Sequence, residues 1–368
     1  MKRVIARALA LLLGWGLALP AMAVSVVFIN PGKSDETYWL TASRAMEAAA
    51  RSLDLQLEVL YAERDNLRVL ALAREVLARP PERRPDYAVV TNDYATGPEL
   101  LRLLDGSGIQ VLMAFSGISS APEREQAGHP RERYRGWIGT LEPHAETAGE
   151  LTADALIKAG RAAKAFGPDG KLHMIAIAGD RSTPSSLRRT EGMRRIVAQA
   201  GDVVLEQEVL AAWNREKAAE QSAWLYQRYP QARLVWAGND LMAFGAMQSW
   251  QARGGKPGTD AFFSGVNTSH EAMEAVRSGR MAALAGGHFI CGAWAMVLVH
   301  DHAKGRDFAD EGLELDRVMF TLFTPAQAER FEQRFGELDF RSVDFRRFSK
   351  VLNPSLKRYD FDFAQLLK

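Results

Sequence analysis

The chain of 368 residues contains a single cysteine, Cys291. One cysteine cannot form a disulfide within the chain, so this fold does not depend on internal disulfides. Cys291 lies in the apolar stretch "GHFICGAWAMVLV", which indicates a buried packing residue and not a reactive thiol.

The motifs of nucleotide and metal chemistry are also missing. No GxGxxG follows the first predicted strand, and no GxxxxGK[ST], GxSxG or HExxH occurs. His300 and His302 are two residues apart, so on a helix they point to different sides and cannot share a metal. We find no nucleophile–base or paired-carboxylate set either. We therefore expect a chain that is not an enzyme and that has no metal or cofactor.

Net charge is almost absent, with 46 basic and 45 acidic residues and a formal charge of +1. A near-neutral chain with interspersed charges lacks the basic patch that binds nucleic acid.

Long hydrophobic runs are missing except at the N-terminus. Lys2, Arg3 and Arg7 precede an apolar run from Ala8 to Pro20, and small residues follow at 21–23. The run is shorter than the roughly 20 residues of a membrane span. This layout predicts a signal peptide, residues 1–23, cleaved after Ala23. Because no lipid-anchoring cysteine follows, we expect the mature protein in the periplasm of a Gram-negative cell.

Short apolar runs alternate with helical patterns through the rest of the chain. Strands are predicted at 25–29, 55–62, 86–91, 109–115, 172–179, 202–210, 233–238, 261–266 and 281–287. Helices are predicted between them, for example at 39–52, 145–159, 186–200, 241–253 and 289–304. The alternation favours parallel sheets with helices on both faces. Because the rhythm occurs twice, it predicts an α/β fold of two doubly wound parallel-sheet lobes.

Two segments differ from this pattern. Residues 118–135 are polar and contain two prolines, and are predicted to be a surface insertion. In "TPAQAERFEQRF", Thr324 is predicted to cap a helix, with Pro325 at its first position. Residues 337–368 alternate aromatic and charged side chains, so we expect an extension that packs on the lobes through its aromatics.

Polar and aromatic residues follow most of the predicted strands. In doubly wound sheets the carboxyl ends of the strands carry the ligand. Amides both donate and accept hydrogen bonds, and flat rings pack on the apolar face of a sugar, so the set favours a neutral solute. Asn and Asp are also common in turns and caps; of the neighbours Asn239 and Asp240, we expect the first to face the ligand and the second to cap the helix. The candidate ligand-binding residues are Asn30, Tyr38, Trp39, Asn92, Asp93, Phe115, Ser116, Arg189, Trp213, Asn239, Asn267 and His288.

From about Val24 to Thr324 the chain resembles the type I periplasmic solute-binding proteins of the ribose/galactose-binding group. The resemblance is carried by "VWAGNDLMAFGAMQSW", "FFSGVNTSHEAMEAVRSGRMAALAGG", "SLRRTEGMRRIV" and "AAWNREKA". LacI-type repressors share this fold but begin with a DNA-reading helix-turn-helix, where this chain has the predicted signal peptide.

The resemblance implies two lobes joined by three hinge crossings, near 139–142, 286–288 and 316–319. It divides the chain into an N-terminal lobe (24–140 plus 288–317), a C-terminal lobe (141–287 plus 318–336) and the extension 337–368. It further implies ligand contacts at Asn30, at Trp39 with Tyr38 before it, at Thr91 or Asn92, at Trp213 and at Asn239.

Several positions depart from the sugar binders of this group. Phe115-Ser116 stands where these sugar binders often have Asp-Arg, and Asn267 stands where they often have Asp. Leu187 takes the position of an arginine that contacts the ligand in them, and Gly287-His288 stands where an amide is common. Fewer charged groups are therefore available to grip hydroxyls. We expect a neutral ligand that is flatter or less hydroxylated than a hexose. A carboxylated ligand requires that Arg181, Arg188 or Arg189 turn inward.

The resemblance leaves three hypotheses about the function. The first is a monomeric receptor that delivers a small solute to an inner-membrane ABC permease. The alternative to it is a sensory receptor that signals through a membrane histidine kinase or a similar protein. The third hypothesis is an exported enzyme. In the two receptor hypotheses, ligand contact with both lobes shifts an open–closed equilibrium.

Overall fold

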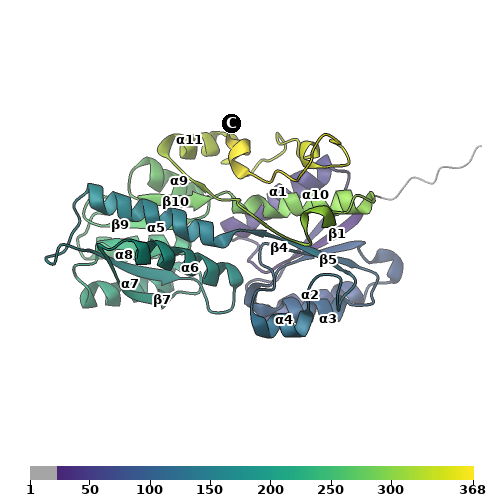
Figure 1. Ribbon diagram of the computed structural model, residues 1–368, viewed down its shortest axis with the longest axis horizontal. Coiled ribbons are helices and arrows are strands. Elements are labelled where there is room, and N and C mark those ends of the chain that lie inside the picture. Colours follow the sequence, from purple (N-terminus) through teal and green to yellow (C-terminus); the bar gives the residue numbers. More distant parts are fainter. Residues whose placement is uncertain (1–22) are drawn as a thin grey trace, which may run out of the picture.

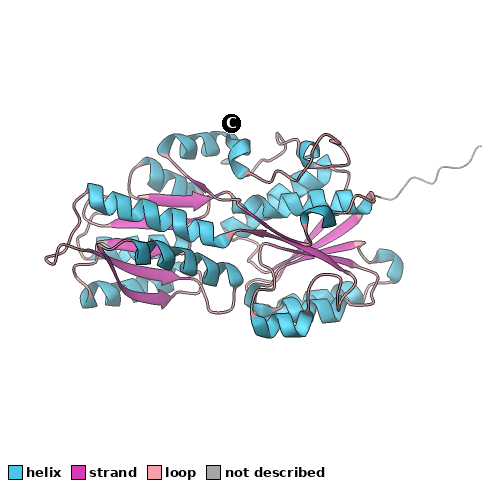
Figure 2. Cartoon of the chain, viewed as in Figure 1, coloured by secondary structure: helices cyan, strands magenta, loops and turns pink. Residues whose placement is uncertain are grey.

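The computed structural model describes residues 23–368. The predicted signal peptide falls almost entirely on residues 1–22, outside the described part. Figure 1 shows two lobes side by side, each with a sheet between layers of helices, and Figure 2 shows the same alternation of strand and helix. The predicted fold class, two parallel-sheet α/β lobes, is confirmed.

The first sheet is wholly parallel, in the order β11-β5-β4-β3-β1-β2. Alternate residues of β1 serve two cores: Val26 and Phe28 pack in one cluster, Val27 and Ile29 in another. Burial on both faces explains why this strand is a continuous apolar run. The strands are β1 (Ser25–Asn30), β2 (Gln56–Tyr61), β3 (Tyr87–Val90), β4 (Gln110–Ala114), β5 (Trp137–Pro143) and β11 (Glu314–Arg317). The helices are α1 (Thr37–Ser52), α2 (Asn66–Leu77), α3 (Gly97–Leu104), α4 (Ala121–Ala127) and α10 (Cys291–Ala303).

The second sheet has the order β12-β10-β9-β8-β6-β7, with β12 antiparallel to β10 and the other pairs parallel. Its strands are β6 (Leu172–Ala178), β7 (Val203–Leu210), β8 (Leu234–Ala237), β9 (Phe262–Val266), β10 (Ala283–Gly286) and β12 (Thr321–Leu322). Its helices are α5 (Ala145–Ala162), α6 (Pro184–Gln199), α7 (Arg215–Arg228), α8 (Asp240–Ala252), α9 (His270–Arg277) and α11 (Pro325–Phe335).

Three connections join the two sheets: β5 to α5, β10 to α10, and β11 to β12. Strand β5, "WIGTLEP", is absent from the sequence-based strands. It stays in the first sheet to Pro143, so the first crossing lies after 143 and not at 140. Its glycine, glutamate and proline disfavour a strand, but pairing with β4 and β11 on its two sides overrides this local preference.

The segments set apart by their composition are ordered parts of the fold. The predicted insertion contains α4, which Ser120 caps by accepting from Glu123 N–H. Thr324 caps α11 as predicted and forms a capping box with Gln327. In Figure 1 the yellow segment after α11 lies across the top of both lobes. It buries a row of aromatics, Phe340, Phe345, Phe348, Tyr359, Phe361 and Phe363.

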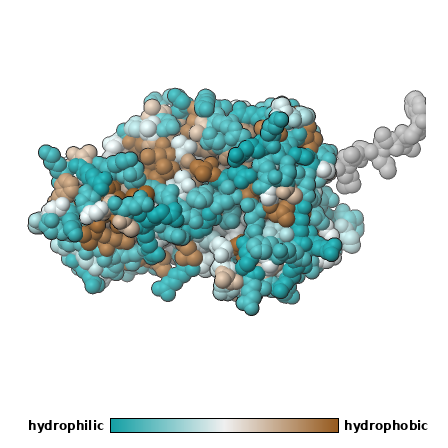
Figure 3. Space-filling view, in the orientation of Figure 1, coloured by the Kyte–Doolittle hydropathy of each residue, from teal (hydrophilic) through white to brown (hydrophobic). Residues whose placement is uncertain are grey.

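Hydrophobic side chains on the face shown in Figure 3 form separate patches among hydrophilic ones. Within residues 23–368, no helix combines the length and the apolar character that crossing a membrane would require.

Candidate functional site

A pocket lies between the two lobes, where the carboxyl ends of parallel strands from both sheets meet. The space among its side chains is about 540 Å³, part of it open to solvent. Its lining comes from the segments that follow eight of the parallel strands as well as from the connections between lobes. Ten predicted residues line it: Tyr38, Trp39, Asp93, Phe115, Ser116, Arg189, Trp213, Asn239, Asn267 and His288. Their contact with a ligand stays a prediction.

Asn30 and Asn92 do not line this pocket, so the structure does not bring these two predicted residues together with the other ten. Asn30 is fully buried: its Oδ1 accepts from Gly32 N–H at 2.9 Å and its Nδ2 donates to Ser43 Oγ at 3.1 Å. Asn92 is also fully buried, and its Oδ1 accepts from Gly97 N–H at 2.8 Å while its Nδ2 donates to Gly117 O at 3.0 Å. Both amides shape the loops after their strands, and each polar atom of the two side chains already has a hydrogen-bond partner within the protein.

The expectation that Asp240 caps α8 is corrected, while the expected ligand contact of Asn239 stays a prediction. Asn239 is the N-cap of α8, with Oδ1 accepting from Met242 N–H at 2.8 Å, and it lines the pocket as well. Asp240 is the first residue of the helix and is buried. Its carboxylate accepts from Asn267 Nδ2 at 2.8 Å and from Ser269 Oγ at 2.5 Å. Asp240 therefore holds the neighbouring loop in place.

Aromatic rings form most of the apolar wall. On the first lobe, the Trp39 ring makes edge-on contacts with the rings of Phe115 and Tyr38, with centroid distances of 5.2 and 5.0 Å. At the crossings, the ring of His288 is stacked between Tyr38, at 4.8 Å, and Phe320, at 4.5 Å. These contacts fix the rings before a ligand arrives, so flat faces are available without a further cost of ordering.

Arg189 turns inward from α6 and is buried. Helix α6 lies close to α5 at Gly149, where a Cβ would collide with the Arg189 carbonyl. The guanidinium donates to Gly238 O at 2.9 Å and to His288 Nε2 at 2.9 Å. Because arginine can only donate, His288 Nε2 is an acceptor, which leaves the proton of the neutral ring on Nδ1.

Burial dominates the electrostatics of this pair. It lowers the pKa of Arg189 to about 10, although Tyr38 and the carboxylates of Asp93 and Asp240 act in the opposite direction. Burial, with the Arg189 charge beside it, lowers the pKa of His288 well below its usual range, so the imidazole is neutral. Arg189 also lies over the rings of Trp213, at 5.7 Å, and Phe320, at 5.6 Å.

Three buried donors of the lining have no hydrogen-bond partner among the described residues: Trp39 Nε1, Arg189 Nε and His288 Nδ1. A buried donor without a partner costs on the order of 1–3 kcal/mol. A ligand with oxygen atoms at these positions would recover part of that cost.

Trp213 forms the wall on the second lobe and is held from behind. Its indole Nε1 donates to Asp180 Oδ2 at 2.6 Å, and its ring lies so close to Gly179 that any side chain there would collide with it. Burial acts to raise the pKa of Asp180, but hydrogen bonds from Thr183, Ser182 and Trp213 outweigh it and lower the pKa. The carboxylate is therefore a charged, permanent acceptor for the indole.

The charged groups of the lining balance one another. Burial raises the pKa of Asp93 to about 6, against the opposing effects of Arg64 and a hydrogen bond with Ser116. Arg64 donates through Nε to Glu36 Oε2 at 2.8 Å and through Nη1 to Tyr94 OH at 3.2 Å. With Arg189, the lining has two acidic and two basic side chains, which gives no formal charge when all are ionised.

The prediction from sequence missed seven lining residues. Glu36 and Arg64 follow strands, and Arg64 would have been found by reading the end of the second predicted strand as closely as the others. Pro143 ends β5, the strand that was not predicted, and Ala145 follows it. Thr183, Ser185 and Phe320 carry no distinct signal. The complete missed set is Glu36, Arg64, Pro143, Ala145, Thr183, Ser185 and Phe320.

Arg188, next to Arg189, points to the crossings instead. It donates through Nε to Glu146 Oε1 at 2.7 Å, and Nη2 is paired with Asp316 on β11. Its position ties α6 to two of the connections. Nowhere in residues 23–368 do three or more His, Cys, Asp or Glu side chains cluster so as to hold a metal ion.

Two doubly wound lobes with a polar and aromatic pocket between them define a ligand-binding protein of the two-lobed type. Residues 26–307 match the family model described as periplasmic binding protein domain, and the chain belongs to this family. The resemblance predicted from sequence is confirmed: the members of the family are periplasmic binding proteins and not enzymes.

Solved structures with the same fold include a close relative. A periplasmic sugar-binding protein from Pseudomonas fluorescens is 39% identical, with a TM-score of 0.82 over 94% of this chain and 100% of that chain. A galactofuranose-binding protein is 17% identical, with a TM-score of 0.71 over 86% of this chain and 100% of that one. An ABC transporter solute-binding protein from Bacillus halodurans with bound myo-inositol is 19% identical, with a TM-score of 0.66 over 85% and 98%. The last two share the fold alone.

Proposed function

We propose that this chain binds a small, neutral, sugar-like solute in the pocket between its lobes and delivers it to an inner-membrane ABC permease. The observation that carries the proposal is the composition of the lining, in which aromatic rings alternate with amides and hydroxyls and the charges balance. A net-neutral pocket gives no advantage to an ionic ligand, and rings with hydrogen-bonding groups between them suit a polyhydroxy compound. The 39% identity to a periplasmic sugar-binding protein supports the same class of ligand.

Arg189 points into the pocket, as a carboxylated ligand would require. Asp93 and Glu36 line the same pocket, so an anion would gain from Arg189 and lose against these carboxylates. We therefore keep the neutral ligand, and expect it to place oxygen atoms near Arg189 and His288.

A thermal-shift screen against sugars, polyols, nucleosides and small organic acids tests the ligand class. A ligand at about 100 times its Kd adds about 2.7 kcal/mol to the free energy of unfolding. For a chain of this size, that raises Tm by roughly 4 °C. We expect this rise with a sugar or a polyol. A rise only with nucleosides or acids would exclude the neutral sugar-like class.

Calorimetry with two tryptophan variants tests the pocket. Trp213→Ala should weaken the ligand found in the screen at least tenfold, because it removes a wall of the pocket. Trp224→Ala is the matched control, since Trp224 is 67% exposed on α7 and outside the pocket lining. Equal affinity in the two variants would show that the ligand binds elsewhere.

A further inference from the structure

The C-terminal segment 337–368, here called the tail, lies beyond the region matched by the family model, which ends at residue 307. Its middle part is fixed to the first lobe through α10, a helix that packs on α1, β4 and β5. Asp301 of α10 is fully buried and accepts from three tail groups: Ser349 Oγ, Lys350 N–H at 2.7 Å and Tyr359 OH at 2.9 Å. Burial acts to raise the pKa of Asp301, but these hydrogen bonds and one with His300 lower it, so the anchor is a charged carboxylate.

Aromatic packing and an ion pair strengthen this first anchor. Phe361 stacks on Trp294 of α10 at 5.2 Å with an angle of 13° between the rings. The Lys350 side chain is 2% exposed and its Nζ lies 2.5 Å from Glu311 Oε1, which also accepts from Tyr359 N–H at 2.8 Å. Residues 349–361 are therefore held to the first lobe by both apolar and charged contacts.

The last residues of the tail are fixed to the second lobe through α11, which packs on α9. Arg330 and Arg334 of α11 donate to the carbonyl oxygens of Leu367 and Lys368, each at 3.0 Å. The ring of Phe363 is fully buried and lies 6.3 Å from Phe331 of α11. These contacts form a second anchor, independent of the first.

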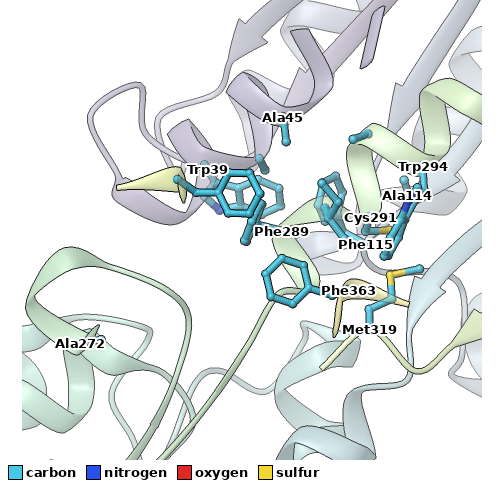
Figure 4. Packing of buried hydrophobic residues seen from close by; sticks show 14 of the residues in the cluster. Trp39, Ala45, Ala114, Phe115, Ala272, Phe289, Cys291, Trp294, Met319 and Phe363 are labelled. Atoms are coloured by element: carbon cyan, nitrogen blue, oxygen red, sulfur yellow. The ribbon is translucent and has the colours of Figure 1, made fainter. Parts of the chain in front are cut away.

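Only Asp362 separates the two anchors. At this point the Phe363 ring packs on the connection from β10 to α10, and Figure 4 shows it beside Phe289. The centroids of these two rings are 5.5 Å apart, and a Cβ on Gly287 would collide with the Phe363 ring. Gly287 has φ of +106°, so a side chain there would be strained as well. The tail thus passes from one lobe to the other directly at a crossing.

We propose that the tail is a strap that links the lobes twice more, through residues 336–348 and again at Asp362, and favours the lobe arrangement seen here over others. Any rotation of one lobe moves α10 relative to α11, and the single residue between Phe361 and Phe363 leaves no slack to absorb it. The contacts at one anchor must then loosen, so the tail has more favourable contacts in the arrangement seen here than in others. This difference in contact free energy shifts the equilibrium between lobe arrangements toward the one seen here. The inference depends on the proposed function only in that ligand binding uses the same lobe motion.

Distance measurements between spin labels on the two lobes test the strap without any ligand. Labels are attached to Arg68→Cys on α2 and Lys217→Cys on α7, both exposed, while the native Cys291 is buried. The full chain is compared with Phe363→Ala and with Phe166→Ala. Phe166 is 42% exposed and is the control for loss of a phenyl ring away from the tail.

We expect Phe363→Ala to shift or broaden the distance distribution, and Phe166→Ala to leave it unchanged. Arg330→Gln, which loses the bond to Leu367 O, should act in the same direction and decides the question if Phe363→Ala does not fold. If Phe363→Ala or Arg330→Gln folds and gives the same distance distribution as the chain without the substitution, the proposal is overturned. If no ligand is found for the chain, the proposed function fails, but this ligand-free measurement still tests the strap.

Discussion

Replacing Asp93 with asparagine is expected to stabilise the folded chain at neutral pH. Asp93 lines the pocket and is 5% exposed, and burial raises the pKa of its carboxyl from 3.8 to about 6. At about 1.4 kcal/mol per pKa unit, the ionised carboxylate costs the folded state about 3 kcal/mol. Asparagine has nearly the same shape and cannot ionise, so it removes this cost.

The sign of the pH dependence follows from the folded pKa lying above the unfolded one. Below about pH 4 Asp93 is protonated in both the folded and the unfolded chain, so its burial does not lower the free energy of unfolding. As the pH rises through about 6, the carboxyl ionises in the folded chain and the wild type becomes less stable than the variant. The variant should therefore match the wild type near pH 4 and exceed it by about 3 kcal/mol at pH 8. Arg64 and Ser116 oppose the shift, while Asp180 and Glu36 add to it, and all four stay unchanged in the variant.

Urea unfolding followed by tryptophan fluorescence at pH 4, 5, 6, 7 and 8 measures this difference. Asp105→Asn is the control, because Asp105 is an exposed carboxylate of the same lobe. A stability difference for Asp93→Asn that stays constant across this range would refute the reasoning, since it would mean that water reaches Asp93 in the ligand-free protein.

Three further substitutions test the supports of the site. Asn239→Ala should lower the free energy of unfolding by about 1 kcal/mol through loss of the α8 cap, and Asn239→Asp should not; equal thermal melts of the two would refute the cap. Asp301→Ala leaves three buried tail donors without an acceptor, so trypsin should cut at Lys357 sooner by mass spectrometry, and unchanged cleavage would count against the first anchor. Gly179→Val should displace the Trp213 ring and weaken the ligand as Trp213→Ala does; wild-type affinity in calorimetry would contradict the packing described here.

The elements predicted best from the sequence are those whose burial is complete. The run predicted at 172–179 is observed as β6, Leu172–Ala178, because a central parallel strand is apolar on both faces. Strand β5 could not be found in this way. Its partners, β4 and β11, come from residues 110–114 and 314–317, and that pairing cannot be read from "WIGTLEP" itself.

The candidate site was predictable to the extent that it follows from topology. Parallel strands bring their carboxyl ends to one edge, so residues after the strands had to gather there. Topology does not say which way a side chain turns. Asn30 ends β1 and Asn92 follows β3, as Trp213 follows β7, but local backbone groups bond to the amides of both asparagines. Phe320 was missed because it lies in a short link between β11 and β12, with no strand end to mark it.

Helix α8 is capped by Asn239, one residue earlier than predicted, and this changes the role of its neighbour Asp240. The N-cap must keep extended backbone, and Asn239 does so with φ −149° and ψ 174°, which places Asp240 inside the helix with its carboxylate turned to the next loop. There it binds Asn267, whose φ of +122° is unusual for a residue other than glycine. Burial raises the pKa of Asp240, while hydrogen bonds from Ser269 and Asn267 oppose the rise and favour the charged form. Asn267 donates one amide N–H to this carboxylate, which fixes the orientation of an amide that lines the pocket. Asp240 thus orients a pocket side chain without lining that pocket itself.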